Sequence, residues 1–271
     1  MQISPTRPLT PSCLLTFVSS VSQFPALAVA TFVLVTALAT PAALLGVAHA
    51  QAAQAPAALE PLLPDLQVLE PSSLYIVAAT DDEEKRLKFA TVMWNAGPGV
   101  LEVHGREDPE TGQISVQQVL YGDGGLQVPG GTVGRFNFEH RHGHLHLSEF
   151  ARYELWSVAE DGSLLELVAL NDNVGFCLMD NVLVDKELTV GDGEPKYPLE
   201  CSGDVQGISP GYGDIYVAQL FEQDLVITDV PDGRYALINT VNPTGVIVEA
   251  TTENNSAMVY LVLEGDTVRL D

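Results

Sequence analysis

Beyond about residue 60, short stretches of apolar or alternating apolar and polar side chains recur along the chain. Alternation with a period of two is typical of strands that bury one face. Turn residues separate the stretches, as in Pro231-Asp232-Gly233. The predicted strands are residues 74–79, 87–94, 100–104, 114–121, 135–146, 150–158, 164–170, 224–228, 235–240, 246–250 and 257–263. No stretch after Gln51 has a long helical period, so we expect one all-β domain, an antiparallel sandwich or barrel.

Residues 180–212 interrupt this pattern with a long run that is neither alternating nor helical. We expect an irregular loop here, and long loops in compact domains are often functional.

The first 59 residues have a different composition, with no acidic residue and a single basic one, Arg7. Apolar side chains dominate residues 24–47, and the run ends in Ala48-His49-Ala50, a small-x-small cleavage pattern. We therefore expect a secretory signal peptide at 1–50, an Ala/Pro-rich tether at 51–62 and the folded domain at 63–271. The alternative is an uncleaved membrane anchor, since roughly 20 apolar residues can cross a bilayer. No basic residue follows the cleavage pattern to stop transfer, which favours the signal peptide.

The excess of acidic residues argues against two classes of binding protein. The chain has 36 acidic residues against 12 basic ones, a formal net charge of -24. Proteins that bind nucleic acid or anionic lipid need an excess of Lys and Arg to meet phosphate groups. We expect neither a nucleic-acid partner nor membrane insertion once the signal peptide is removed. The 46% of hydrophobic residues is enough for a sizeable core.

Cysteine usage is consistent with export. Cys13 lies in the predicted signal peptide, which leaves Cys177 and Cys201 in the mature chain. An even pair in an oxidising compartment predicts a disulfide bridge, and the alternative is two buried free thiols.

The segment from Phe136 to His146 contains His140, His142, His144 and His146. Side chains on a strand alternate between faces, so these four imidazoles would project to one side of a continuous strand. Several imidazoles on one face can bind Cu, Zn, Ni or Fe, and the affinity order favours Cu(II). The alternative is a histidine-rich exposed strand without a function. The pattern alone does not separate copper from zinc.

The residues around this cluster resemble a known family. His142-Gly143-His144-Leu145-His146, followed by Glu149-Phe150-Ala151-Arg152-Tyr153-Glu154-Leu155, is similar to the copper-binding signature of the lysyl oxidase family. Further matches to family motifs follow the same order along the chain: residues 63–66, 175–178, 207–211, 214–216, 224–231, Glu249 and 253–255. The resemblance covers roughly residues 63–265 and implies the family's antiparallel β-sandwich with long irregular loops.

The resemblance also implies a function. His142, His144 and His146 would bind copper, with His140 as an extra imidazole, and Tyr216 would become a tyrosine-derived quinone. The protein would be a secreted copper-dependent amine oxidase. Its substrates would be primary amines, either lysines of a partner protein or small amines, and its products aldehydes, peroxide and ammonia. The alternatives are a catalytically inactive copper-binding module, and a structural sandwich whose metal is incidental.

A calcium site is implied as well. Its ligands would be Asp65, the Leu66 carbonyl, Glu249, Asn254 and Asn255, which supply the hard oxygen atoms that calcium prefers. A further ligand is a carboxylate in animal members of the family but falls on Thr251 here. The alternative is an ordinary acidic turn.

One position departs from the family pattern. The lysine that joins the oxidised tyrosine in lysine tyrosylquinone falls on Asn173. An amide does not add to an oxidised ring as an amine does, so this cofactor should not form from position 173. Lys186 or Lys196 could reach Tyr216 instead, or water could add to the ring to give a topaquinone-type cofactor. The remaining alternative is an unmodified tyrosine.

Overall fold

The computed structural model describes residues 60–197, 203–221 and 223–271. The predicted signal peptide and most of the predicted tether lie outside these residues. Strands make up most of the described part of the chain, with one short 3-10 helix, η1 (Asp123–Gly125). Nothing helical within the described ranges could span a lipid bilayer.

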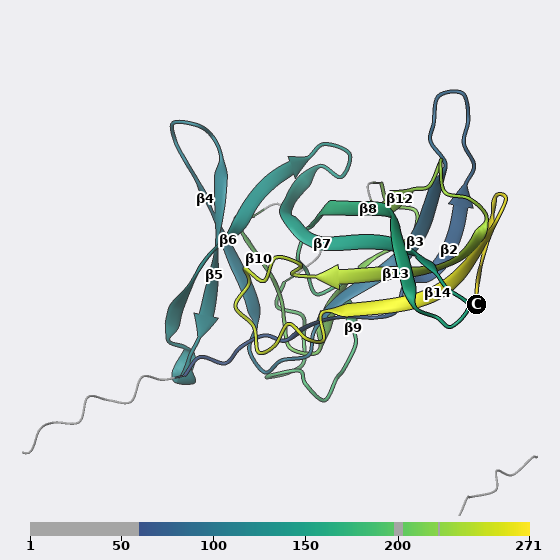
Figure 1. Ribbon diagram of the computed structural model, residues 1–271. Coiled ribbons are helices and arrows are strands. Elements are labelled where there is room, and N and C mark those ends of the chain that lie inside the picture. The colour runs from purple at the N-terminus through teal and green to yellow at the C-terminus, as the bar shows by residue number, and fades with distance from the viewer. Residues whose placement is uncertain (1–59, 198–202, 222) are drawn as a thin grey trace, which may run out of the picture. The chain divides into compact units, whose positions relative to one another are not determined.

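The strands form two antiparallel sheets (Figure 1). The six-stranded sheet contains β1 (Leu66–Val68), β2 (Ser72–Val77), β3 (Arg86–Asn95), β9 (Val182–Leu183), β11 (Tyr212–Tyr216) and β12 (Asp224–Val226). The nine-stranded sheet contains β4 (Leu101–Glu107), β5 (Ile114–Tyr121), β6 (Gln127–Glu139), β7 (His144–Val158), β8 (Leu164–Phe176), β10 (Val205–Ile208), β13 (Gly233–Val241), β14 (Ser256–Glu264) and β15 (Thr267–Leu270). In the smaller sheet, β3 pairs with β1, β2, β11 and β12. In the larger sheet, β7 pairs with β6, β8 and β13. The all-β antiparallel sandwich is confirmed.

The core lies between the two sheets. The Phe89 ring of β3 meets the Tyr153 ring of β7 edge to face, with centroids 4.9 Å apart, and both side chains are fully buried. Each such side chain removed from water stabilises the fold by about 1.5–3 kcal/mol. The Asn239 Nδ2 of β13 also donates to Thr91 Oγ1 of β3 at 2.9 Å. Residues from opposite sheets therefore hold the sandwich together.

Two strand predictions are wrong. Residues 135–146 are not one strand, because β6 ends at Glu139 and β7 begins at His144 in the opposite direction. Residues 246–250 form no strand. There, the Val248 N–H donates to Gln118 Oε1 at 2.8 Å and its carbonyl accepts from Gln118 Nε2 at 2.8 Å. A side-chain amide satisfies the backbone groups that a neighbouring strand would otherwise pair.

The described parts of the predicted irregular loop, residues 180–197 and 203–212, are mostly irregular, with two short strands among them. β9 and β10 lie within residues 180–212, and β11 begins at its end. β11 matters most, because it carries Asp214 and Tyr216 beside the central strand β3. Its Tyr216 lies opposite Thr91 in the pairing register.

Candidate metal centre

A tight turn between β6 and β7 assembles the histidine cluster. The Gly143 N–H donates to the Glu139 carbonyl at 2.7 Å, which closes the turn. Gly143 has φ +78, a left-handed conformation that glycine adopts without a steric penalty. His144 and His146 then lie on one face of β7, and the turn returns His142 to the same place. The cluster is therefore built by a hairpin and not by strand alternation alone.

Three histidine nitrogen atoms converge in this cluster. His142 Nδ1 lies 3.2 Å from His146 Nε2, and His144 Nε2 lies 3.0 Å from the same atom. Around an ion with metal–nitrogen bonds of about 2.0–2.1 Å, donors at right angles lie about 2.9 Å apart and tetrahedral donors about 3.4 Å apart. The three nitrogens are thus spaced as ligands of one metal ion. His140 stays outside, exposed, with its ring 5.1 Å from that of Phe138.

Burial keeps His144 and His146 in the protonation state that a metal ion needs. Removal from water lowers the pKa of His146 to about 4, and the charges of His144 and His142 lower it further. Burial and the charge of His142 also lower the pKa of His144. Both imidazoles are therefore neutral near pH 7, with lone pairs free for coordination.

Gly175 of β8 supports His146 from behind. A Cβ atom at position 175 would lie 3.1 Å from His146 Cβ and 3.5 Å from His146 Nδ1. Any larger residue would press on this ligand. The sequence shows Gly175 only as the first residue of a motif, so its role depends on the pairing of β7 with β8.

Tyr216 lies directly beside the cluster. Its ring centroid is 6.2 Å from that of His146 and 4.0 Å from that of Phe176. The side chain is 4% exposed, and its hydroxyl oxygen accepts a hydrogen bond of 2.8 Å from the Cys177 N–H. Burial raises the pKa of Tyr216 well above its usual value, and the charge of Asp214 adds to this. The phenol is therefore neutral and held in one orientation.

Tyr216 and two of the histidines share a cavity of about 280 Å³. Its remaining walls come from the loop after β8, from β11 and from the loop after β11. The complete lining is His142, His144, Met179, Asn181, Asp214, Ile215, Tyr216 and Leu220. Sequence reasoning identified the histidines and the tyrosine but missed Met179, Asn181 and Leu220, and it gave Asp214 no role. These residues lie far apart along the chain, so only the fold brings them together.

No lysine is among these lining residues, all of which the structure describes. Asn173 is exposed on β8 and is not part of the lining either. The chain has four lysines, and each amine has its own partner. They are Lys85 with the Gly265 carbonyl at 2.7 Å, Lys88 with Asp224 at 2.5 Å, Lys186 with Glu187 at 4.0 Å and Lys196 with Glu102 at 2.8 Å. Neither Lys186 nor Lys196 lines the cavity that contains Tyr216, so lysine tyrosylquinone does not fit this arrangement.

The residues expected to bind calcium do meet in the fold. Asn254 Nδ2 lies 3.1 Å from both carboxylate oxygens of Asp65, and Asn255 Nδ2 lies 2.8 Å from Glu249 Oε1. The Leu66 N–H donates to Glu249 Oε2 at 2.8 Å. The Oδ1 atoms of Asn254 and Asn255 are buried with no hydrogen-bond partner. Burial raises the pKa of Glu249, as expected of a carboxylate that lacks a cation. The donor set suits a hard cation.

Of the predicted cysteine pair, only Cys177 can be placed. It is fully buried at the end of β8. Cys201 lies outside the described residues, so the bridge stays a prediction.

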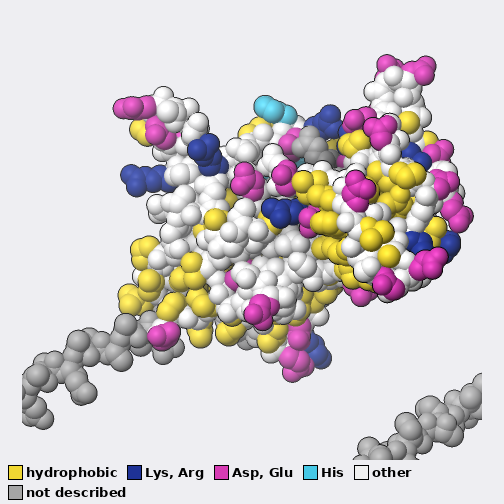
Figure 2. Space-filling view, viewed as in Figure 1, with side chains coloured by type: hydrophobic (Ala, Val, Ile, Leu, Met, Phe, Trp, Pro, Cys, Tyr) yellow, Lys and Arg dark blue, Asp and Glu magenta, His cyan; other side chains and the backbone are white. Residues whose placement is uncertain are grey.

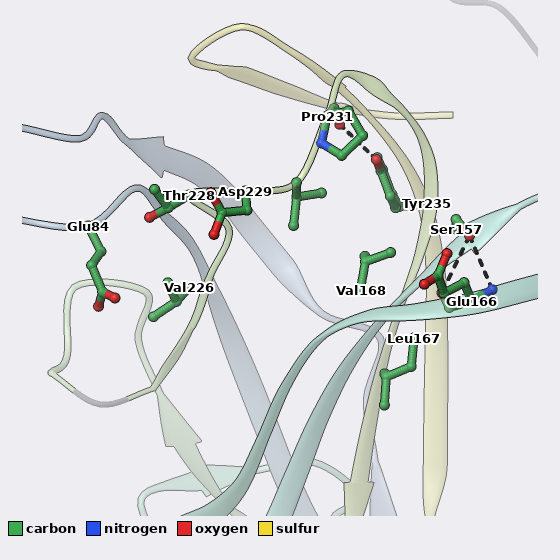
Figure 3. A pocket seen from close by; sticks show the side chains of 11 residues that line it. Glu84, Ser157, Glu166, Leu167, Val168, Val226, Thr228, Asp229, Pro231 and Tyr235 are labelled. Carbon is green, nitrogen blue, oxygen red and sulfur yellow. Dashed lines mark hydrogen bonds between the residues drawn. The ribbon is translucent and has the colours of Figure 1, made fainter.

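A larger cavity of about 610 Å³ contains none of the three histidines (Figure 3). Its polar lining includes Glu84, Glu166 and Asp229, while the Tyr235 hydroxyl donates to the Pro231 carbonyl at 2.7 Å. No side chain among its lining residues is a typical ligand for copper. The candidate metal ligands and Tyr216 therefore lie at the smaller cavity.

Comparisons with known proteins agree with this site. A family model described as lysyl oxidase matches residues 126–271, more than half of the chain. Protein-lysine 6-oxidase of Rattus norvegicus is 35% identical over 115 residues, which are 42% of this chain and 25% of that protein. The Sus scrofa protein-lysine 6-oxidase is 35% identical over 42% of this chain and 41% of its own length. Lysyl oxidase homolog 1 of Homo sapiens is 35% identical over 42% of this chain and 18% of its own length. The aligned region therefore covers less than half of each of these relatives. The chain belongs to the lysyl oxidase family.

Proposed function

We propose that the protein is a secreted, copper-dependent amine oxidase of the lysyl oxidase type. It would oxidise primary amines, either lysine side chains of a partner protein or small amines, to aldehydes. One observation carries the proposal: His142 Nδ1 and His144 Nε2 lie 3.2 and 3.0 Å from His146 Nε2, and two of these histidines, His142 and His144, line a cavity together with the buried Tyr216. A metal ligand set beside an oxidisable phenol is the minimum that this chemistry needs.

His142 through Nδ1, and His144 and His146 through Nε2, would hold the copper ion. Among divalent ions, imidazole sites bind Cu(II) most tightly, which favours copper over zinc. Copper would supply the redox chemistry that oxidises a tyrosine ring with molecular oxygen. Tyr216 is the tyrosine in reach, since its ring is 6.2 Å from that of His146.

The test is an assay of products. The overall reaction converts a primary amine, O₂ and H₂O into an aldehyde, ammonia and hydrogen peroxide. Copper-loaded mature protein should release peroxide and ammonia in equal amounts from butylamine. The metal-free protein and the His144→Ala variant should release neither. Equal peroxide from the copper-loaded protein and the His144→Ala variant would contradict the ligand assignment.

A second function, an inactive copper-binding module, has an observation in its favour. No lysine lines the cavity, so the family's usual cross-linked quinone has no amine partner among the described residues. A quinone could then form at Tyr216 only with water as the added nucleophile. A redox-cycling quinone stain distinguishes the two functions. A stain that disappears in Tyr216→Phe supports the oxidase, and no stain at full copper occupancy supports the copper-binding module.

The acidic surface favours cationic substrates. Figure 2 shows acidic side chains at the tips of the β2–β3 and β4–β5 hairpins, on either side of the visible histidine side chain. Residues 81–84 and 107–110 are exposed at these tips. A negative surface raises the local concentration of cations and their association rate. Increasing salt should therefore lower kcat/KM for amines more than kcat.

A further inference from the structure

One edge of β8 has no strand paired with it. Among the described strands, β8 pairs only with β7, which occupies its other edge. Within the described ranges, no backbone hydrogen bond from another segment reaches residues 165–169. The outward N–H and C=O groups of this edge are therefore open. An open edge of this kind can pair with a strand of another chain.

The open edge is long and apolar. β8 is 13 residues long, and its first seven residues read Leu-Leu-Glu-Leu-Val-Ala-Leu. Leu164 is 41% exposed, Leu165 63% and Leu170 47%. Proteins commonly place Lys or Pro on an edge strand to prevent its association, and β8 contains neither. Its side chains therefore favour pairing with a partner.

The cavity of about 610 Å³ lies between this edge and the segment around the end of β12 (Figure 3). β8 contributes residues 166–168 to its lining, and the facing wall contains Val226 and residues 228–231. At one end, Asn171 Nδ2 donates to the Asp224 carbonyl at 3.1 Å and joins the two walls. The volume equals that of roughly twenty water molecules at about 30 Å³ each, enough for a short length of extended chain.

The charges of the lining favour a basic partner. Figure 3 shows Glu166 on the side of the cavity opposite Glu84 and Asp229. None of the lining residues, all of which the structure describes, is a Lys, an Arg or a His. Glu84 pairs with Arg86 at 2.9 Å. No ion pair in the described part of the chain involves Glu166 or Asp229. A second copy of this chain would bring like charges together, whereas a basic segment would meet acids on both walls.

We propose that the β8 edge and this cavity form a docking groove for an extended basic segment of a partner chain, which pairs with β8 as an added strand. Backbone hydrogen bonds to β8 supply affinity, and the side chains supply specificity. Because side chains on a strand alternate, basic ones can meet Glu166 and Asp229 while apolar ones pack on Val168 and Val226. The groove contains none of the three clustered histidines and not Tyr216, so docking goes beyond the proposed oxidase function.

The test is fluorescence anisotropy with a labelled hexapeptide of alternating arginine and valine. An N-terminal label and a C-terminal amide leave this peptide without a primary amine, so it is not a substrate of the proposed oxidase. The mature protein should bind it with equal affinity in the presence and absence of copper. A hexapeptide of alternating glutamate and valine should not bind, since its charges repel those of the groove.

Backbone methylation tests whether the peptide binds as a strand. Successive N–H groups of a strand point to opposite sides, so only one alternate set can donate to β8. Methylation of that set of nitrogens should abolish binding, and methylation of the other set should leave it unchanged. Equal affinity of the two methylated peptides would overturn the added strand.

Variants of the groove locate the binding site. Val226 is 39% exposed, and Val226→Trp should fill the groove and abolish binding. Val246→Trp is the matched control, since Val246 is 47% exposed and lies outside the lining. Glu166→Gln should weaken binding roughly two- to fivefold, the range for an exposed ion pair, and Glu160→Gln should not. An unchanged copper stoichiometry shows that each variant is folded.

Three results would overturn the docking groove: no binding of the arginine–valine peptide, equal binding of the glutamate–valine peptide, or undiminished binding in Val226→Trp. A dimer of the mature protein that Val226→Trp dissociates would assign the groove to a second copy and would overturn the basic partner. None of these results bears on the oxidase function, because peroxide release from butylamine is measured separately.

Discussion

At the residue scale, the metal centre depends on groups that are not ligands. Gly175 leaves room for His146, and the turn that ends at Gly143 returns His142 to the cluster. Neither glycine has metal chemistry of its own. The positions of the three imidazoles are therefore sensitive to backbone changes that leave every ligand in place.

Substitution Gly175→Ala tests this dependence. The added methyl group would lie 3.1 Å from His146 Cβ and displace the ligand by a few tenths of an ångström. We expect copper affinity to fall by roughly tenfold, about 1.4 kcal/mol, measured by competition with a chelator. Gly203→Ala is the matched control, since the nearest atom to its Cβ is 3.9 Å away. Unchanged affinity in Gly175→Ala would contradict the close fit.

Glu102 is a buried carboxylate whose contribution to the stability of the fold can be measured. Its carboxylate accepts hydrogen bonds from Tyr121, from Tyr197, from Lys196 at 2.8 Å and from His104 at 2.7 Å. Burial raises its pKa, but these hydrogen bonds together outweigh burial and lower the pKa to about 2. A carboxyl group whose pKa is lower in the folded than in the unfolded chain stabilises the fold at pH values above its unfolded pKa. This stabilisation is lost as the pH falls towards the folded pKa of about 2.

The replacement Glu102→Gln should therefore lower the free energy of unfolding at pH 7 by about 1–3 kcal/mol. The difference from the parent protein should shrink as the pH falls from about 4.5 towards 2. Urea denaturation at several pH values measures both quantities. Glu110→Gln, at an exposed tip, should show no such difference. A penalty that stays constant with pH would contradict the ionised state of Glu102.

At the element scale, the sequence predicts most strands but not the way in which they are joined. Alternation identified residues 114–121 correctly, because this strand has one buried and one open face. It failed at 135–146, where the apolar and polar residues alternate across a turn, and only Gly143 marks the reversal. It also missed β11, since Tyr212–Tyr216 is buried on both faces and shows almost no alternation.

The sequence likewise predicts some residues of the candidate site and not others. The histidines are predictable because they are four residues apart or less, and Tyr216 is identifiable from the family motif. Asp214 and Asn181 are not predictable as a pair, since their contact requires β11 to pair with β9. Local sequence determines the ligands, and tertiary pairing determines the cavity around them.

The predicted calcium site links elements of both sheets. Asp65 directly precedes β1 of the smaller sheet, and Asn255 directly precedes β14 of the larger one. A cation bound between them should stabilise the whole sandwich. At 100 times its Kd, calcium adds about 2.7 kcal/mol to the free energy of unfolding.

Calcium should therefore raise the Tm of the mature protein, and a chelator should reverse the effect. The Asp65→Asn variant should lose this increase in Tm, because the substitution removes a carboxylate from the predicted calcium site. Glu160→Gln, an exposed acid in the β7–β8 turn, should keep it. An equal Tm with calcium and with chelator would favour the ordinary acidic turn.

At the scale of the whole molecule, the composition is acidic and two predictions about export remain to be tested. A formal net charge of -24 keeps the chain soluble and attracts cations. The predicted signal peptide and the predicted bridge between Cys177 and Cys201 both require export to an oxidising compartment. These two predictions can be checked on one sample of exported protein.

Intact mass should place the N-terminus of this sample at Gln51. Thiol titration of the denatured, unreduced protein should find no free sulfhydryl, because Cys13 is removed and the other two cysteines are paired. A mass that includes residues 1–50 would support the membrane anchor. Two free thiols per chain would show that the cysteines are not bridged.

The measurement that tests the account most directly is electron paramagnetic resonance of the copper-loaded mature protein. We predict one Cu(II) per chain with imidazole nitrogen ligands, a signal that His144→Ala abolishes or changes and His140→Ala leaves unchanged. The matched histidines differ only in whether they belong to the converging cluster. If the spectrum is the same in His144→Ala as in the parent protein, the three histidines do not form the copper centre.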